Sequence, residues 1–110
     1  MEKQAAQDLI QFINESPTNY HAIQNIKREL TEHGFKQLFS GEAWHIERGE
    51  KYFVTKNHSS LFAFVPGKGD VAENGFKLIC AHSDSPTFRI KPSAEMTVEG
   101  KYLKLNTEVY

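Results

Sequence analysis

A histidine and an aspartate stand two residues apart where a strongly apolar stretch of the sequence ends. Residues 76–81 are mostly apolar, and His82 and Asp84 follow them directly. A neutral imidazole is a good zinc ligand, and a carboxylate on its second ring nitrogen fixes the tautomer and raises the basicity of the ring. His82 is therefore a candidate metal ligand. Asp84 is the candidate catalytic-site carboxylate that supports it, provided that the chain turns after the apolar stretch, as Pro86 favours.

The spacing of these two residues also permits a plainer interpretation. A His-x-Asp triplet is common by chance, and a histidine at the end of a strand is usually solvated or hydrogen-bonded. Asp84 alone could cap the turn. Spacing leaves both interpretations open, because one histidine does not make a catalytic zinc site, which needs about three protein ligands for each metal.

Other residues that could do chemistry lack the partners that the chemistry needs. Cys80 is expected to be a small core residue rather than a nucleophile. Ser83 and Ser85 lack the G-x-S-x-G setting of a hydrolase serine. Four further histidines show no metal-ligand spacing and are expected to be surface or partly buried residues: His21, His33, His45 and His58.

Two helices are predicted at the start of the chain. Residues 2–14 carry apolar side chains at spacings of three and four, which is typical of a helix with one apolar face. Pro17 separates this helix from a second one, for which Thr18 is the expected N-cap. Gly34 stands where a left-handed C-terminal cap is expected.

From residue 35 the pattern changes to that of strands. Residues 51–55 and 60–65 are rich in aromatic and β-branched side chains, with a hairpin turn between them. Residues 66–75 are expected to be a surface loop. Residues 76–81 are expected to form a buried, central strand. Further strands are expected at 35–39, at 88–91, where Pro92 would end the strand, and at 102–110. The predicted fold class is α/β, with two helices followed by a mixed β-sheet.

Composition excludes several classes of function. The chain has 110 residues and a net charge of −1, so no basic excess indicates a nucleic-acid partner. No apolar run approaches the roughly 20 residues that span a bilayer, and the first residues lack the apolar core of a signal peptide. The single cysteine, Cys80, has no intrachain partner for a disulfide. We therefore expect a cytoplasmic protein without a membrane or nucleic-acid partner.

The site segment, Ala-His-Ser-Asp-Ser-Pro at residues 81–86, resembles the M18 family of metalloaminopeptidases, the aspartyl aminopeptidase group. The resemblance covers nearly the whole chain, and several blocks in the same order make it far more specific than the triplet alone. The other matching blocks are residues 16–22, 34–35, 51–57, 74–76, 89–92 and 102–110.

The resemblance implies a phosphorylase/hydrolase-like metallopeptidase domain with a co-catalytic site of two metal ions. The ions are usually zinc, with Co²⁺ or Mn²⁺ as alternatives. His82 matches the family's first metal-binding histidine, and Asp84 matches the acidic residue that supports it. The family's other ligands and its general base would lie beyond Tyr110. The implied reaction is hydrolysis of the N-terminal residue from a peptide, and the implied assembly of the full-length protein is a homo-oligomer.

On this resemblance, residues 1–110 are expected to be the N-terminal part of a peptidase domain, ending near an inserted second domain and inactive alone. The last predicted strand stops at the chain end, which suits a truncated piece and a natural terminus equally. The alternative function is a non-catalytic interaction module that keeps the N-terminal fold. For a piece, we expect exposed apolar surface or unpaired sheet edges.

Overall fold

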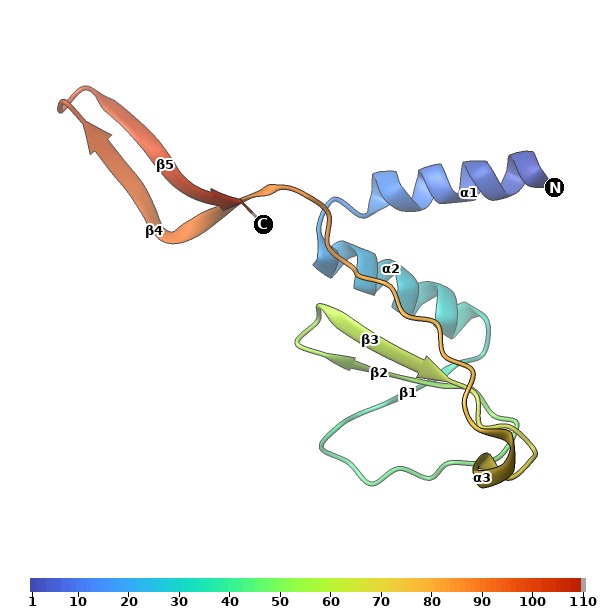
Figure 1. Cartoon of the computed structure of the whole chain (residues 1–110). Coiled ribbons are helices and arrows are strands. Elements are labelled where there is room, and N and C mark those ends of the chain that lie inside the picture. The colour runs from blue at the N-terminus through green and yellow to red at the C-terminus, as the bar shows by residue number, and fades with distance from the viewer. Residues whose placement is uncertain (110) are drawn as a thin grey trace.

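The computed structural model describes residues 1–109 and begins with two helices, as the sequence predicts. Helix α1 spans Glu2–Glu15 and helix α2 spans Asn19–Glu32. Figure 1 shows α2 lying between α1 and a three-stranded sheet. None of the helices within the described residues is long and apolar enough to cross a membrane.

Both ends of α2 are capped as expected. The hydroxyl of Thr18 accepts a hydrogen bond from the backbone N–H of His21 at 3.3 Å, which satisfies one of the free donors of the first turn. At the other end, Gly34 has φ +84°. The backbone N–H of Phe35 donates to the carbonyl of Leu30 at 3.0 Å, the bond that closes a Schellman cap.

The junction between α1 and α2 is held by polar contacts around Glu15. Its carboxylate accepts hydrogen bonds from the amide of Gln11 at 2.9 Å and from the guanidinium of Arg28 at 3.1 Å. Its backbone carbonyl accepts from the amide of Asn25 at 2.9 Å. The Gln11 amide first, and then Arg28, lower the pKa of Glu15 below its usual value, because both favour the charged carboxylate.

Three strands form a mixed sheet behind α2, which confirms the predicted fold class. They are β1 (Lys36–Leu38), β2 (Tyr52–Lys56) and β3 (Ser60–Phe64), in the order β1-β2-β3. β1 pairs with β2 in parallel, and β2 pairs with β3 in antiparallel orientation. The central strand, β2, is therefore paired along both of its edges.

A tight turn joins β2 to β3. Asn57 and His58 both have positive φ, 54° and 57°, and the N–H of Ser59 donates to the carbonyl of Lys56 at 3.3 Å. This is the pattern of a type I′ turn, whose twist suits an antiparallel hairpin. The hairpin matters for the site because Ser59 contacts the segment that carries His82.

The core is small and lies where α2 packs on β2. Phe53 is 1% exposed, and Tyr52 beside it is also buried. From α2, Ala22 and Ile23 are buried. The hydroxyl of Tyr52 accepts a hydrogen bond from the backbone N–H of Glu47 at 3.0 Å, so this buried polar group has a partner.

A second sheet is a long hairpin of β4 (Phe88–Val98) and β5 (Tyr102–Val109), which projects away from the helices and the first sheet (Figure 1). The prediction that Pro92 ends the strand is wrong. The register breaks between Ile90 and Glu95 and then continues. Pro92 lies inside this bulge, where a missing N–H costs no ladder hydrogen bond. Tyr110, the last residue of the predicted strand, lies outside the described residues.

The prediction of a buried strand at residues 76–81 is also wrong. These residues form neither strand nor helix, and Ile79 is 97% exposed. Cys80, expected in the core, is exposed as well. A strand exists only if its backbone groups pair with a neighbour, and none of the strands within residues 1–109 pairs with this segment. Residues 76–81 have the apolar pattern of a buried strand, but residues 1–109 contain no strand that pairs with them.

The predicted loop at residues 66–75 contains one short helix, α3 (Val71–Asn74). The carboxylate of Asp70 accepts a hydrogen bond from the backbone N–H of Ala72 at 3.0 Å, so Asp70 acts as its N-cap. A single turn of this kind carries no apolar period, which is why the sequence pattern gives no sign of it.

The molecule is more open than a globular protein of its size. The radius of gyration is 19.8 Å, whereas a compact chain of this length has about 13 Å. The accessible surface is 9619 Å², against about 6,200 Å² for a folded monomer of this mass. Large apolar side chains, among them Phe76, Leu78 and Ile79, contribute to this surface, which confirms the expected exposure.

Candidate metal centre

The candidate residues lie on an extended segment that leads from α3 to the β4–β5 hairpin. Residues 76–87 have no helix or strand of their own. His82 and Asp84 both lie near the middle of the segment, where it passes α2 and the β2–β3 hairpin. The side chain of His82 is 82% exposed and that of Asp84 is 51% exposed. Both are thus accessible in the described part of the chain.

His82 and Asp84 contact each other, as a supporting role for Asp84 requires. Nδ1 of His82 lies 3.1 Å from Oδ1 of Asp84 and 2.9 Å from the backbone carbonyl oxygen of Asp84. Asp84 therefore engages one ring nitrogen of His82 twice, once through its side chain and once through its backbone.

These two contacts determine which nitrogen carries the proton when the ring is neutral. A carbonyl oxygen can only accept a hydrogen bond, and an ionised carboxylate likewise only accepts. Nδ1 must therefore carry a proton in order to donate to Asp84. In a neutral imidazole the other nitrogen, Nε2, then holds the free lone pair. His82 thus offers Nε2 as a ligand atom, with its tautomer fixed by Asp84.

This donor chemistry suits a zinc ion, but the described residues supply only part of a site. Imidazole nitrogen is a preferred zinc ligand, and a carboxylate behind it is its usual support. Within residues 1–109, no group of three or more His, Cys, Asp or Glu side chains lies close enough to hold a metal ion. His82 and Asp84 fit as one ligand and its partner.

Ser83, between these two residues, makes a contact that sequence reasoning missed. Its hydroxyl donates to the backbone carbonyl of Ser59 in the β2–β3 turn at 2.9 Å, and the bond is partly buried. The two residues are 24 positions apart in the sequence. No local pattern indicates such a contact, because it depends on where the hairpin and the segment meet.

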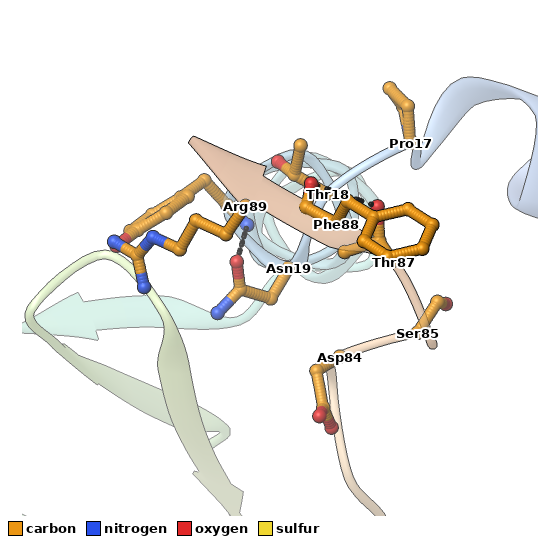
Figure 2. A pocket seen from close by; sticks show the side chains of 9 residues that line it. Pro17, Thr18, Asn19, Asp84, Ser85, Thr87, Phe88 and Arg89 are labelled. Carbon is orange, nitrogen blue, oxygen red and sulfur yellow. Dashed lines mark hydrogen bonds between the residues drawn. The ribbon is translucent and has the colours of Figure 1, made fainter. Parts of the chain in front are cut away.

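Two hollows adjoin the segment. One has a volume of about 340 Å³ and is lined by apolar side chains of α1, α2 and β3 together with residues 81–85. The other, of about 140 Å³, lies at the start of α2 and is shown in Figure 2. Asp84 and Ser85 line both. Asp84 therefore lies between the two hollows, whereas His82 lines only the larger one.

The other histidines do not join His82. All four are exposed, as expected. Nδ1 of His21 lies 2.7 Å from the hydroxyl of Thr18, and Nδ1 of His33 lies 2.8 Å from the carbonyl of Glu29. These are local contacts at the two ends of α2, so helix geometry explains them.

Comparison with known proteins gives a consistent result along the whole chain. A family profile described as "Aminopeptidase I zinc metalloprotease (M18)" matches residues 12–110. A probable M18 family aminopeptidase 2 of Clostridium novyi is 57% identical over 96% of this chain and 24% of its own length. Aspartyl aminopeptidase 1 of Schizosaccharomyces pombe is 44% identical over 98% of this chain and 23% of its own length. The chain thus spans about a quarter of the length of the curated relatives that it matches.

Solved structures agree with the sequence matches. The cryo-EM structure of the Ape4 and Nbr1 complex contains a chain that is 44% identical, with a TM-score of 0.87 over 98% of this chain and 21% of that one. The S. cerevisiae mApe1 dodecamer is 31% identical, with a TM-score of 0.85 over 96% of this chain and 25% of that one. Since the family profile covers most of the sequence, this chain belongs to the M18 family of aminopeptidase I zinc metalloproteases.

Proposed function

We propose that this chain is the N-terminal part of the peptidase domain of a zinc-dependent aminopeptidase, which removes N-terminal residues from peptides. The observation that carries the proposal is the contact between Nδ1 of His82 and the carboxylate of Asp84 at 3.1 Å. This contact leaves Nε2 of His82 free to bind a metal ion. The family match over residues 12–110 supports the reaction class.

In this proposal His82 binds a zinc ion through Nε2, and Asp84 acts on His82. The Asp84 carboxylate holds the proton on Nδ1, keeps the ring from rotating and makes Nε2 more basic. Zinc bound in such sites acts as a Lewis acid toward a carbonyl and lowers the pKa of water. The role of this chain is therefore to present one oriented imidazole to the metal.

Two zinc ions are proposed for the complete site, with Co²⁺ or Mn²⁺ as alternatives. A catalytic zinc ion needs about three protein ligands and an open position, and the described residues supply one. The remaining ligands and the general base are assigned to polypeptide outside residues 1–110. The 110-residue chain alone is accordingly proposed to be inactive.

The exposed apolar surface favours this proposal over a non-catalytic interaction module. A module that folds by itself would bury most of its large apolar side chains. Here the accessible surface of 9619 Å² exceeds by more than half the roughly 6,200 Å² expected for a folded monomer. Residues 76–81 in particular are exposed along an unpaired backbone, as expected of a strand that lacks its neighbours.

The complete protein is proposed to act in the cytoplasm as a homo-oligomer. A single cysteine suits a reducing compartment. The dodecamer formed by the S. cerevisiae relative supports an oligomer. The net charge of −1 gives no support for a nucleic-acid partner.

The test uses the natural protein, purified from the cells that produce it. Purified protein is incubated with peptides that differ only in a free or an acetylated N-terminus, and with peptides that begin with acidic or neutral residues. We expect cleavage of the first residue from free N-termini only, loss of cleavage after metal chelation, and recovery when zinc is added. Cleavage of acetylated peptides, or turnover that survives chelation, would contradict the proposal.

Asp84→Asn tests the supporting carboxylate separately. The amide keeps the size of the side chain but loses its charge. Partners of this kind typically contribute about 10- to 100-fold to metal affinity or activity, so we expect a loss within that range. Glu108→Gln, the same change of charge in the β4–β5 hairpin, is the matched control and should leave activity unchanged.

A further inference from the structure

We propose that Ser83 is a positioning residue, which clamps the His82 segment to the β2–β3 hairpin and so holds the imidazole ready for zinc. The proposal rests on the proposed function, because it assumes that His82 is a ligand. It adds a residue that the donor chemistry of the site does not require. The observation that carries it is the bond from the Ser83 hydroxyl to the Ser59 carbonyl at 2.9 Å.

The residues around His82 need such a clamp because residues 82–87, which follow the apolar stretch, form no helix or strand. The bond of Ser83 joins this segment to the β2–β3 turn, 24 positions earlier in the sequence. The bonds between His82 and Asp84 are local and fix the ring relative to the segment. They do not fix the segment relative to the fold.

The acceptor belongs to a regularly paired hairpin beside the site. Ser59 closes the type I′ turn, and the pairing of β2 with β3 runs without a break from Tyr52 and Phe64 to Lys56 and Ser60. A carbonyl held by such a hairpin is a fixed reference point. A hydrogen bond to this carbonyl holds the segment in a fixed position relative to the sheet.

The side chains of His82, Ser83 and Asp84 make contacts on two sides of the segment. The side chains of His82 and Asp84 contact each other, while that of Ser83, between them, contacts the hairpin. The bond of Ser83 is partly buried, whereas His82 is largely exposed. One side of the segment is therefore anchored, and the other is left free for a metal ion.

The size of the expected effect follows from the net value of one hydrogen bond. Losing the bond allows the segment to sample positions in which Nε2 is misplaced, and zinc must then restore the order. The net contribution of a single hydrogen bond corresponds to about a 2- to 12-fold change in an equilibrium constant. We expect Ser83→Ala to weaken zinc binding by a factor in that range.

The experiment measures zinc affinity in the metal-free protein as its own cells produce it, by competition with a chromophoric chelator. Ser83→Ala should weaken zinc binding, and Ser83→Thr, which keeps the hydroxyl, should restore it. Ser60→Ala is the matched control. It removes a hydroxyl that donates to the carbonyl of Lys56 at 3.0 Å within the same hairpin, whereas the hydroxyl of Ser83 donates across to Ser59.

Limited proteolysis of the metal-free variants gives a readout that does not depend on zinc. Cleavage within residues 81–85 should be faster in Ser83→Ala than in wild type, while cleavage within β2 should be unchanged. Wild-type zinc affinity and cleavage rates in Ser83→Ala, or an equal loss in Ser60→Ala, would overturn the positioning role. Zinc binding that is also insensitive to His82→Ala, or absent from wild type, would overturn the proposed function itself.

Discussion

Residues 52–56 and residues 76–81 are two apolar stretches of similar length that differ completely in structure. The first is β2, whose Phe53 is 1% exposed. The second forms no strand, and its Ile79 is 97% exposed. β2 is paired with β1 on one edge and with β3 on the other. Within residues 1–109, no strand lies against the second stretch.

The difference teaches that available partners, rather than local apolar character, decide which of the two becomes a strand. Backbone N–H and C=O groups must be paired when they are buried. β2 receives its partners from residues within about 20 positions on either side. Residues 76–81 would need strands that residues 1–109 do not provide. The His82 segment that follows is joined to the β2–β3 turn by the bond from Ser83 to Ser59.

The largest expected effect comes from truncating a buried side chain of β2. Phe53→Ala in the 110-residue chain should lower the free energy of unfolding by about 3–5 kcal/mol, because it opens a cavity in a small core. Ile79→Ala in the same chain should change it by less than about 0.5 kcal/mol, as exposed positions do. Urea unfolding followed by circular dichroism measures both. Similar losses for the two variants would show that residues 76–81 are already packed.

The same Ile79→Ala substitution should behave differently in the protein as its own cells produce it. If further polypeptide pairs with residues 76–81, Ile79 becomes a core residue, and its truncation should cost about 2–5 kcal/mol. Thermal unfolding of the two proteins side by side makes this measurement. An exposed-site value in both would contradict the proposal that this stretch is covered in the complete domain.

Gly34→Ala tests whether α2, which covers β2, ends by local geometry alone. Gly34 has φ +84°, and a Cβ there would meet nothing within 4 Å. The cost is therefore that of the backbone conformation, about 1 kcal/mol. Gly41→Ala is the matched control, since it has open space and no positive φ. Equal stability of the two variants would argue against the Schellman cap.

The smallest effect concerns the contact between α1 and α2. The Gln11 amide and Arg28 lower the pKa of Glu15 in the folded protein below the usual value of 4.5. The charged carboxylate therefore stabilises the fold above pH 4.5, and this contribution is lost as the pH falls through the lowered pKa. Glu15→Gln should slightly reduce stability at pH 7 and flatten its decline below pH 4.5. Urea midpoints across this range would show a parallel decline if the contact were irrelevant.

Local signals in the sequence were enough to predict most of the first 65 residues. The N-cap at Thr18, the left-handed Gly34 and the apolar periods of both helices act within a few residues, so a sequence pattern contains them. The contact between Asp84 and the ring of His82 was also predicted from the spacing of the two residues. Whether His82 binds a metal stays a prediction.

The features that the sequence analysis predicted wrongly or missed have one physical cause in common. Each depends on contacts with residues that are distant in the sequence. Residues 76–81 carry the pattern of a buried strand, but the pattern cannot say whether neighbours exist. A proline usually ends a strand, but a bulge in the β4–β5 hairpin accommodates Pro92. The anchor of Ser83 joins residues 24 positions apart. Such contacts follow from tertiary structure and have no signature in a local window.

The most direct test of the central claim is the zinc content of the protein as its own cells produce it, compared with His82→Ala and with His45→Ala. His45 is exposed and belongs to no candidate ligand set, so its variant controls for the loss of an imidazole. We predict that His82→Ala loses bound zinc and at least about 100-fold of its aminopeptidase activity, more than a supporting partner contributes. His45→Ala should retain both. Unchanged zinc content and turnover in His82→Ala would contradict the assignment of His82 as a metal ligand.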